Sequence, residues 1–178
     1  MLSLLYSYIT DPYATIKRDF APVDVAVVAV FFAAIGTAVQ RPIGAEWLGM
    51  SPFFMVAVYF LGMGVVWAVQ SALIEFIAQW FGHSTPRLVL FAWLGLAQLP
   101  MALLVPLTAV GTTMPTMAPI VGLLSGCARI LWLVLQVMTI KKLYSVTWVR
   151  AGLLYIAPVL SLMTVAVVFV LLVGVFGW

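Results

Sequence analysis

Two charged side chains stand within apolar stretches of this sequence, where a charge needs either a partner or a function. Glu75 lies in "SALIEFIA", and Arg129 lies in "SGCARILWLVLQV". A charge inside a bilayer is costly, and such residues usually pair with one another or mark a pathway. The two residues therefore raise two hypotheses: an ion pair that joins two helices, or a polar site for a solute. A structural pair is the simpler of the two.

The remaining reactive side chains do not form a catalytic or metal-binding pattern. His83 is the only histidine and stands in the short loop "FGHSTP", and Cys127 is the only cysteine. One good ligand is too few for a metal site. The serine of "LLSG" has no histidine within the membrane to act as its base, which disfavours an intramembrane protease. We predict no enzymatic activity, no cofactor and no metal.

Composition places the chain in a bilayer. Of its 178 residues, 66% are hydrophobic and only 7% are charged, and the mean hydropathy is +1.23. Such a chain belongs to the membrane class. The spans use nearly all of the sequence, so no room remains for a separate catalytic domain. The net charge of +3 is scattered along the chain and does not indicate a nucleic-acid surface.

The predicted fold is all-α: a polytopic membrane protein with five transmembrane helices. A hydrocarbon core of ~30 Å requires about 20 apolar residues per helix. Segments that meet this requirement lie near 22–39, 52–80, 87–109, 119–139 and 149–175. Residues 1–21 form an N-terminal interfacial or cytoplasmic segment, and residues 22–178 form the transmembrane domain. Pro100, Pro106 and Pro158 fall within spans and should bend the third and fifth helices.

Basic residues sort to one side of this five-span frame, with Arg41 alone on the other side. The six on the shared side are Lys17, Arg18, Arg87, Lys141, Lys142 and Arg150. By the positive-inside rule the N terminus is cytoplasmic and the C terminus is outside. These residues also form a candidate surface for a partner protein or for anionic lipid headgroups, although topology setting alone would explain them.

Small and polar residues share a helix face with each intramembrane charge. The faces contain Gly64, Ala68 and Ser71 in the second span and Gly122, Ser125, Gly126 and Gln136 in the fourth. Helices approach closely at such residues, and "GLLSG" is a GxxxG motif. We place Glu75 about five residues, ~7 Å, from the cytoplasmic end of its span, and Arg129 about ten residues, ~15 Å, from its own. The predicted pair is Glu75 with Arg129; glutamine partners or a water-filled cavity are the alternatives for Arg129.

Three segments of the chain resemble the Yip domain family, which is named for binding Ypt/Rab GTPases. They are "DPYATIKRDF" before the first span, "AWLGLAQLPMALLVP" in the third, and "IKKLYSVTWVRAGLLYIAP" between the fourth and fifth. The resemblance covers almost the whole length and implies a non-enzymatic five-span membrane protein. The chain lacks the long cytosolic N-terminal region, with an acidic motif that contains glycine and proline, that accompanies Rab engagement in eukaryotic members. It is more similar to the compact prokaryotic members.

The leading hypothesis is a Yip-type integral protein of a bacterial cytoplasmic (inner) membrane, acting as a scaffold or as a partner-binding, membrane-organising element. Its expected partners are membrane lipids and a protein on the cytoplasmic face, without nucleic acid, and a homo-oligomer is compatible with the sequence. The alternative is a small transporter or channel with a polar pathway around Glu75 and Arg129.

Overall fold

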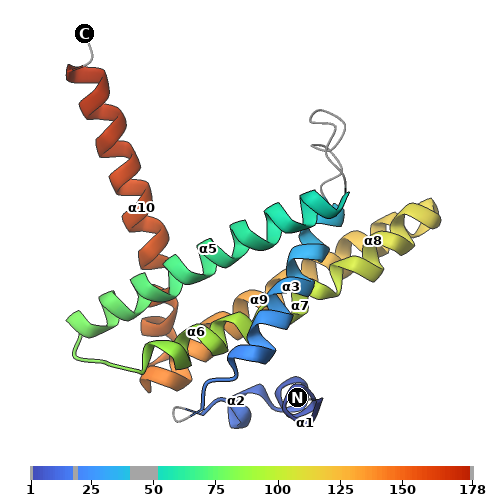
Figure 1. Cartoon of the computed structure of the whole chain (residues 1–178), viewed down its shortest axis with the longest axis horizontal. Coiled ribbons are helices and arrows are strands. Elements are labelled where there is room, and N and C mark those ends of the chain that lie inside the picture. The colour runs from blue at the N-terminus through green and yellow to red at the C-terminus, as the bar shows by residue number, and fades with distance from the viewer. Residues whose placement is uncertain (1, 18–19, 41–51, 177–178) are drawn as a thin grey trace.

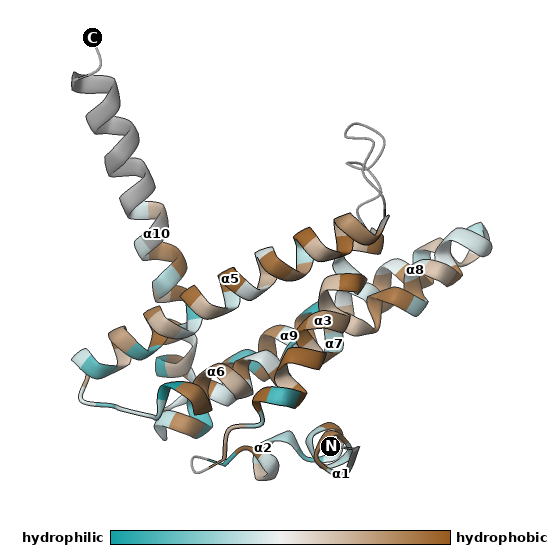
Figure 2. Ribbon diagram, viewed as in Figure 1, coloured by the Kyte–Doolittle hydropathy of each residue, from teal (hydrophilic) through white to brown (hydrophobic). Residues whose placement is uncertain are grey.

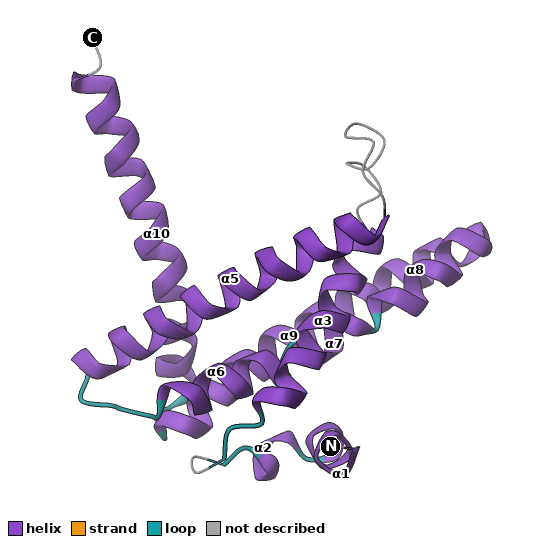
Figure 3. Cartoon of the chain, viewed as in Figure 1, coloured by secondary structure: helices purple, strands orange, loops and turns teal. Residues whose placement is uncertain are grey.

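The described part of the protein is helical throughout. The computed structural model describes the chain except residues 1, 18–19, 41–51 and 177–178. Helices joined by short turns make up these described ranges, which contain no strand (Figure 3). The all-α prediction is therefore confirmed for them. Arg18 and Arg41 lie outside the described residues.

The helices overlap all five predicted segments, and their bounds differ from the predicted ones mainly at the ends. In chain order they are α1 (Leu2–Thr10), α2 (Pro12–Thr15), α3 (Val23–Gln40), α5 (Pro52–Trp80), α6 (Arg87–Leu96), α7 (Leu99–Ala102), α8 (Leu104–Thr113), the 3₁₀ turn η2 (Pro115–Met117), α9 (Ala118–Tyr144) and α10 (Trp148–Phe176).

Length and apolarity identify three helical segments that can cross a membrane. These are Phe53–Trp80, Arg87–Thr113 and Pro115–Tyr144, and Val23–Val39 and Trp148–Ser161 are shorter apolar helices. Large hydrophobic side chains lie on their outer surfaces, such as Phe53 (88% exposed) and Leu61 (67%). Much of the α3 and α5 ribbon is accordingly brown, the colour of hydrophobic residues (Figure 2). Such surfaces require a lipid environment, so the chain is a helical membrane protein.

Pro100 interrupts the third predicted span, which divides into α6, α7 and α8. A proline has no N–H to donate, so the helix tightens before it. The backbone N–H of Gln98 donates to the carbonyl of Gly95 at 3.0 Å, one residue short of the α-helical partner. The side-chain amide of Gln136 on α9 donates to the carbonyl of Leu94 at 3.0 Å. The expected bend is thus a break that another helix stabilises.

Helix α3 lies at the centre of the packing. It contacts α5 on one side and the α6–α7–α8 run on the other, while α9 packs along that run and α10 packs against α9 and α5. Figure 1 shows α8 and α9 side by side, and α1 and α2 at one end of the bundle. The core is built mainly from α3, α6 and the second half of α9. Its largest fully buried side chain is Trp93.

Close helix approach occurs at glycines other than the predicted ones. A Cβ on Gly95 of α6 would collide with the indole of Trp67 on α5, and a Cβ on Gly36 of α3 would collide with the carbonyl oxygen of Met101. A Cβ on any of the predicted glycines would meet no atom of the described chain within 4 Å; these are Gly64, Gly122 and Gly126. Within the described residues these glycines therefore do not mark a close helix contact, because spacing alone does not say which face another helix covers.

We expect Gly95→Ala to destabilise the protein by about 1–3 kcal/mol, because the added methyl group must displace the Trp67 ring. Gly126→Ala is the matched control within a helix. It should be neutral or slightly stabilising, since alanine has the better helix propensity. Thermal unfolding in nanodiscs measures both, and equal stability of the two variants would contradict the packing of Trp67 on Gly95.

Candidate functional site

The buried carboxylate of Glu75 connects two helices and a loop. Glu75 lies on α5 and is 3% exposed. Its Oε2 accepts a short hydrogen bond from the Tyr144 hydroxyl at the end of α9. Its Oε1 accepts from Gln79 Nε2 at 3.0 Å and from the backbone N–H of Thr85 at 3.4 Å. Both carboxylate oxygens therefore have donors, as a buried charged group requires.

The loop between α5 and α6 completes this arrangement. The Thr85 hydroxyl donates to the carbonyl of Leu143 at 3.4 Å. Leu143 lies in the last turn of α9, where a carbonyl has no partner within the helix. The end of α5, the start of α6 and the end of α9 thus meet around Glu75. We call this the basic end of the bundle, because Arg87, Lys141 and Lys142 lie at these helix termini.

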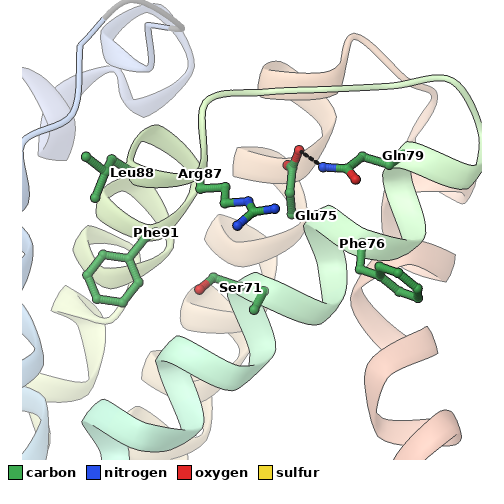
Figure 4. Close-up of a pocket in the computed structure, with 8 residues that line it drawn as sticks. Ser71, Glu75, Phe76, Gln79, Arg87, Leu88 and Phe91 are labelled. Carbon is green, nitrogen blue, oxygen red and sulfur yellow. Dashed lines mark hydrogen bonds between the residues drawn. The ribbon is translucent and has the colours of Figure 1, made fainter.

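A pocket of about 410 Å³ lies beside Glu75. Its polar lining comes from Ser71, Glu75 and Gln79 on α5 and from Arg87 at the start of α6. Figure 4 shows Arg87 extending toward Glu75, with Phe91 and Leu88 on the α6 side. The pocket therefore has a carboxylate and a guanidinium on opposite walls. Such walls suit a small polar or zwitterionic molecule.

Arg129 does not join Glu75 in the structure. The partners of the Glu75 carboxylate are Tyr144, Gln79 and Thr85, and Arg129 is exposed on α9. Helix α9 continues to Tyr144, five residues beyond its predicted end. Arg129 therefore lies fifteen residues, about 22 Å, from the tyrosine that bonds Glu75, beyond the reach of its side chain. The predicted Glu75–Arg129 pair does not form, because Arg129 lies farther from the end of α9 than the predicted helix bounds placed it.

The predicted small and polar faces are buried only in part. Ser71, Ser125 and Gln136 are buried, whereas Ala68 and Gly122 are exposed. Gln136 is 1% exposed, and its amide supports the break after α6. Buried positions of α9 gather in its second half, from Leu135 to Tyr144. The second half of α9 packs into the core, and the first half lies against α8 with Ser125 and Ala128 buried.

Two lysines and two aromatic rings meet at the basic end. Lys142 Nζ lies 4.1 Å from the centroid of the Tyr13 ring of α2, and Lys141 Nζ lies 5.4 Å from it. Lys141 Nζ also lies 4.5 Å from the centroid of the Trp148 ring. Cations in these positions are attracted by the ring faces. We call Tyr13, Lys141, Lys142 and Trp148 the Lys–aromatic surface. A cavity of about 510 Å³ adjoins this surface and is lined in part by Tyr13 and both lysines.

The N-terminal segment is fastened to the bundle by Trp93. The indole Nε1 of Trp93 donates to the carbonyls of Lys17 at 3.0 Å and Phe20 at 2.9 Å. Tyr8 stacks on the same indole with 5.9 Å between ring centroids, and Ile16 is 1% exposed. Burial raises the pKa of the Tyr8 hydroxyl above its ordinary value, so this side chain stays neutral at physiological pH. The segment is therefore part of the packed structure.

The described basic residues of the predicted surface occupy different places. Lys141 and Lys142 belong to the Lys–aromatic surface, Arg87 lines the Glu75 pocket, and Arg150 lines a separate groove with His83. Lys17 belongs to the N-terminal segment and is exposed. The sequence analysis missed Tyr144 and Thr85 as partners of Glu75. A tyrosine at a helix end is common in membrane proteins, so its position alone did not single it out.

Comparisons with family models, with curated proteins and with solved structures found no match to this chain. Within the described residues no group of three or more His, Cys, Asp or Glu side chains could hold a metal ion. The polar contacts at the basic end are therefore the main guide to function.

A double-mutant cycle should separate the two possible partners of Glu75. We expect Glu75→Gln and Tyr144→Phe each to lower the free energy of unfolding by about 1–3 kcal/mol, because a buried polar group loses its partner. Their coupling should exceed about 0.5 kcal/mol, while Glu75→Gln and Arg129→Gln should be additive within that value. Unfolding in nanodiscs measures all six proteins, and coupling to Arg129 in place of Tyr144 would overturn this assignment.

Proposed function

We propose that the protein is a non-enzymatic, five-span membrane scaffold of the Yip type that binds a partner protein through the basic end of its bundle. The proposal places this end in the cytoplasm and the protein in a bacterial inner membrane. The Lys–aromatic surface is the binding surface, and acidic side chains on the partner are its natural complement.

One contact carries the proposal. Tyr13 belongs to "DPYATI" and Lys141 and Lys142 belong to "IKKLYSVTWVR", the two cytoplasmic segments on which the family resemblance depends. These segments lie more than 120 residues apart in the chain, yet the lysines lie over the Tyr13 ring. Residues that serve only as topology signals need no such convergence. The shared surface therefore favours a recognition role for both segments.

The positions of the helix ends support the orientation. The contacts of Glu75 and Thr85 bring the ends of α5 and α9 to the start of α6. Helix α10 begins at Trp148, directly after α9, so Arg150 lies at the same end. Arg87, Lys141, Lys142 and Arg150 thus lie at one end of the bundle, which supports a cytoplasmic location of this end under the positive-inside rule.

The alternative function, a small transporter, draws support from the Glu75 pocket alone. Against it, the donors on both carboxylate oxygens give Glu75 a structural role, and Arg129 lies too far away to share a pathway. Solute flux in proteoliposomes that Glu75→Gln abolishes without unfolding the protein would favour the transporter over the scaffold.

Labelling of single cysteines tests the topology. In a Cys127→Ser background, Thr10→Cys and Thr147→Cys should react with a membrane-impermeant maleimide only from the cytoplasmic side. Thr116→Cys, in the turn between α8 and α9, should react only from the outer side. The three positions are exposed on the protein. A cysteine that is not labelled from one side of the membrane is therefore shielded by the membrane and not by the protein. Labelling of Thr10 and Thr116 from the same side would contradict the five-span proposal.

Site-specific cross-linking in native membranes tests the partner surface. We expect p-benzoylphenylalanine at position 13 to give one discrete protein adduct, because this residue keeps an aromatic ring beside the lysines. Lys142→Glu should reduce the adduct at least five-fold through charge repulsion. The same probe at Leu123, an exposed residue of α9 remote from the basic end, is the control. Identical adducts from both positions, or an adduct that Lys142→Glu leaves intact in a folded protein, would count against a specific partner surface.

A further inference from the structure

A cavity of about 540 Å³ lies where α10 begins, separate from the Glu75 pocket and from the Lys–aromatic surface. It is formed by the end of α5, the loop that follows it, Val146 between α9 and α10, and the first four turns of α10. Most of its lining is apolar and comes from Ile77, Phe81, Leu153, Leu154, Ala157 and Leu160. We call it the α10 groove.

Both ionisable side chains that line the groove are basic types. His83 comes from the loop after α5, and Arg150 comes from the first turn of α10. No carboxylate is among the lining residues. The N-terminus of α10 adds a partial positive charge beside Arg150, as helix N-termini do. This part of the groove is therefore complementary to an anion.

The apolar lining continues along α10 away from this positive part. Leu160 lies ten residues beyond Arg150, which corresponds to about 15 Å along a helix axis. Leu153 and Leu160 are 62% and 57% exposed, so the groove opens onto the apolar outer surface of α10. The groove thus has a cationic end at the level of the basic residues and an apolar channel leading toward the hydrocarbon core.

We propose that the α10 groove is a binding site for an anionic phospholipid. The phosphate lies against Arg150 and His83, and one acyl chain follows the apolar lining toward Leu160. Basic pockets between membrane helices recognise lipid headgroups in this way, and a guanidinium is well suited to phosphate oxygens. A phospholipid carries an anionic head and a hydrocarbon chain in one molecule, which matches the two parts of the groove.

This site is independent of the proposed partner surface. Val146 lines both the groove and the cavity beside the Lys–aromatic surface, but none of the four residues of that surface lines the groove, and neither Arg150 nor His83 contributes to that surface. Variants of the groove therefore test lipid binding, and variants of the Lys–aromatic surface test partner binding. Failure of one proposal can be distinguished from failure of the other.

Native mass spectrometry of the delipidated protein in detergent tests the proposal. Dioleoyl phosphatidylglycerol should bind at one preferred site at least five-fold more tightly than dioleoyl phosphatidylcholine. Glycerol phosphate, which has the anionic head without the chains, should not bind measurably. Binding of glycerol phosphate at the lipid's affinity would mean that the groove is a site for a soluble phosphate and would overturn the lipid assignment.

Two variants with matched controls test the two ends of the groove separately. Arg150→Gln should weaken phosphatidylglycerol binding about five-fold, the effect of one cation near a headgroup, whereas Lys17→Gln removes a basic charge outside the groove and should have no effect. Ala157→Phe should fill the channel and reduce binding at least as much, whereas Val159→Phe, on α10 but outside the lining, should not.

Thermal unfolding in lipid-free detergent confirms that each variant is folded. Unchanged lipid binding in folded Arg150→Gln and Ala157→Phe would overturn the proposal. So would a change of oligomeric state in lipid-free Ala157→Phe that Val159→Phe does not show, because the groove would then be covered by a second copy of the chain.

Discussion

The burial of one carboxylate constrains the arrangement of the basic end. Glu75 is nearly inaccessible, so its two oxygens must receive hydrogen bonds from the protein. The donors come from Tyr144 on α9, from Gln79 one turn further along α5, and from the backbone at Thr85. These bonds can form together only if α5, the loop after it and the end of α9 meet. In a membrane, where burial of apolar surface contributes little between helices, such bonds and close packing hold the helices together.

The centre of the bundle depends on packing rather than on charge. Trp67 of α5 lies flat against Phe91 of α6, with ring centroids 3.7 Å apart, and its Nε1 donates to the carbonyl of Phe91 at 2.8 Å. The same indole covers Gly95, one turn further along. Trp93, two residues after Phe91, instead holds the N-terminal segment. Helix α6 therefore links the membrane core to the segment that carries Tyr13.

These connections give the proposed functional surfaces a rigid base. The Lys–aromatic surface depends on α2, which is kept in place by the buried Ile16 and by the contacts of Trp93. The α10 groove depends on the approach of α10 to the end of α5, next to Glu75. A scaffold needs surfaces that persist without a bound ligand, because preorganisation lowers the cost of binding. The buried polar bonds at the basic end meet this requirement.

The sequence alone determined the class of protein and the approximate helix bounds, because apolar length acts locally. It also predicted a bend at Pro100, where the proline has no N–H to donate. It did not determine which side chains meet. The Glu75–Arg129 pair and the GxxxG contact were reasonable from helix faces, but partners depend on the depth and rotation of one helix against another. Five additional residues at the end of α9 move Arg129 about 7 Å away from the level of Glu75 and bring Tyr144 to it. Tertiary packing decided this register, because it is set by contacts such as those of Trp67 and Trp93 between segments far apart in the chain.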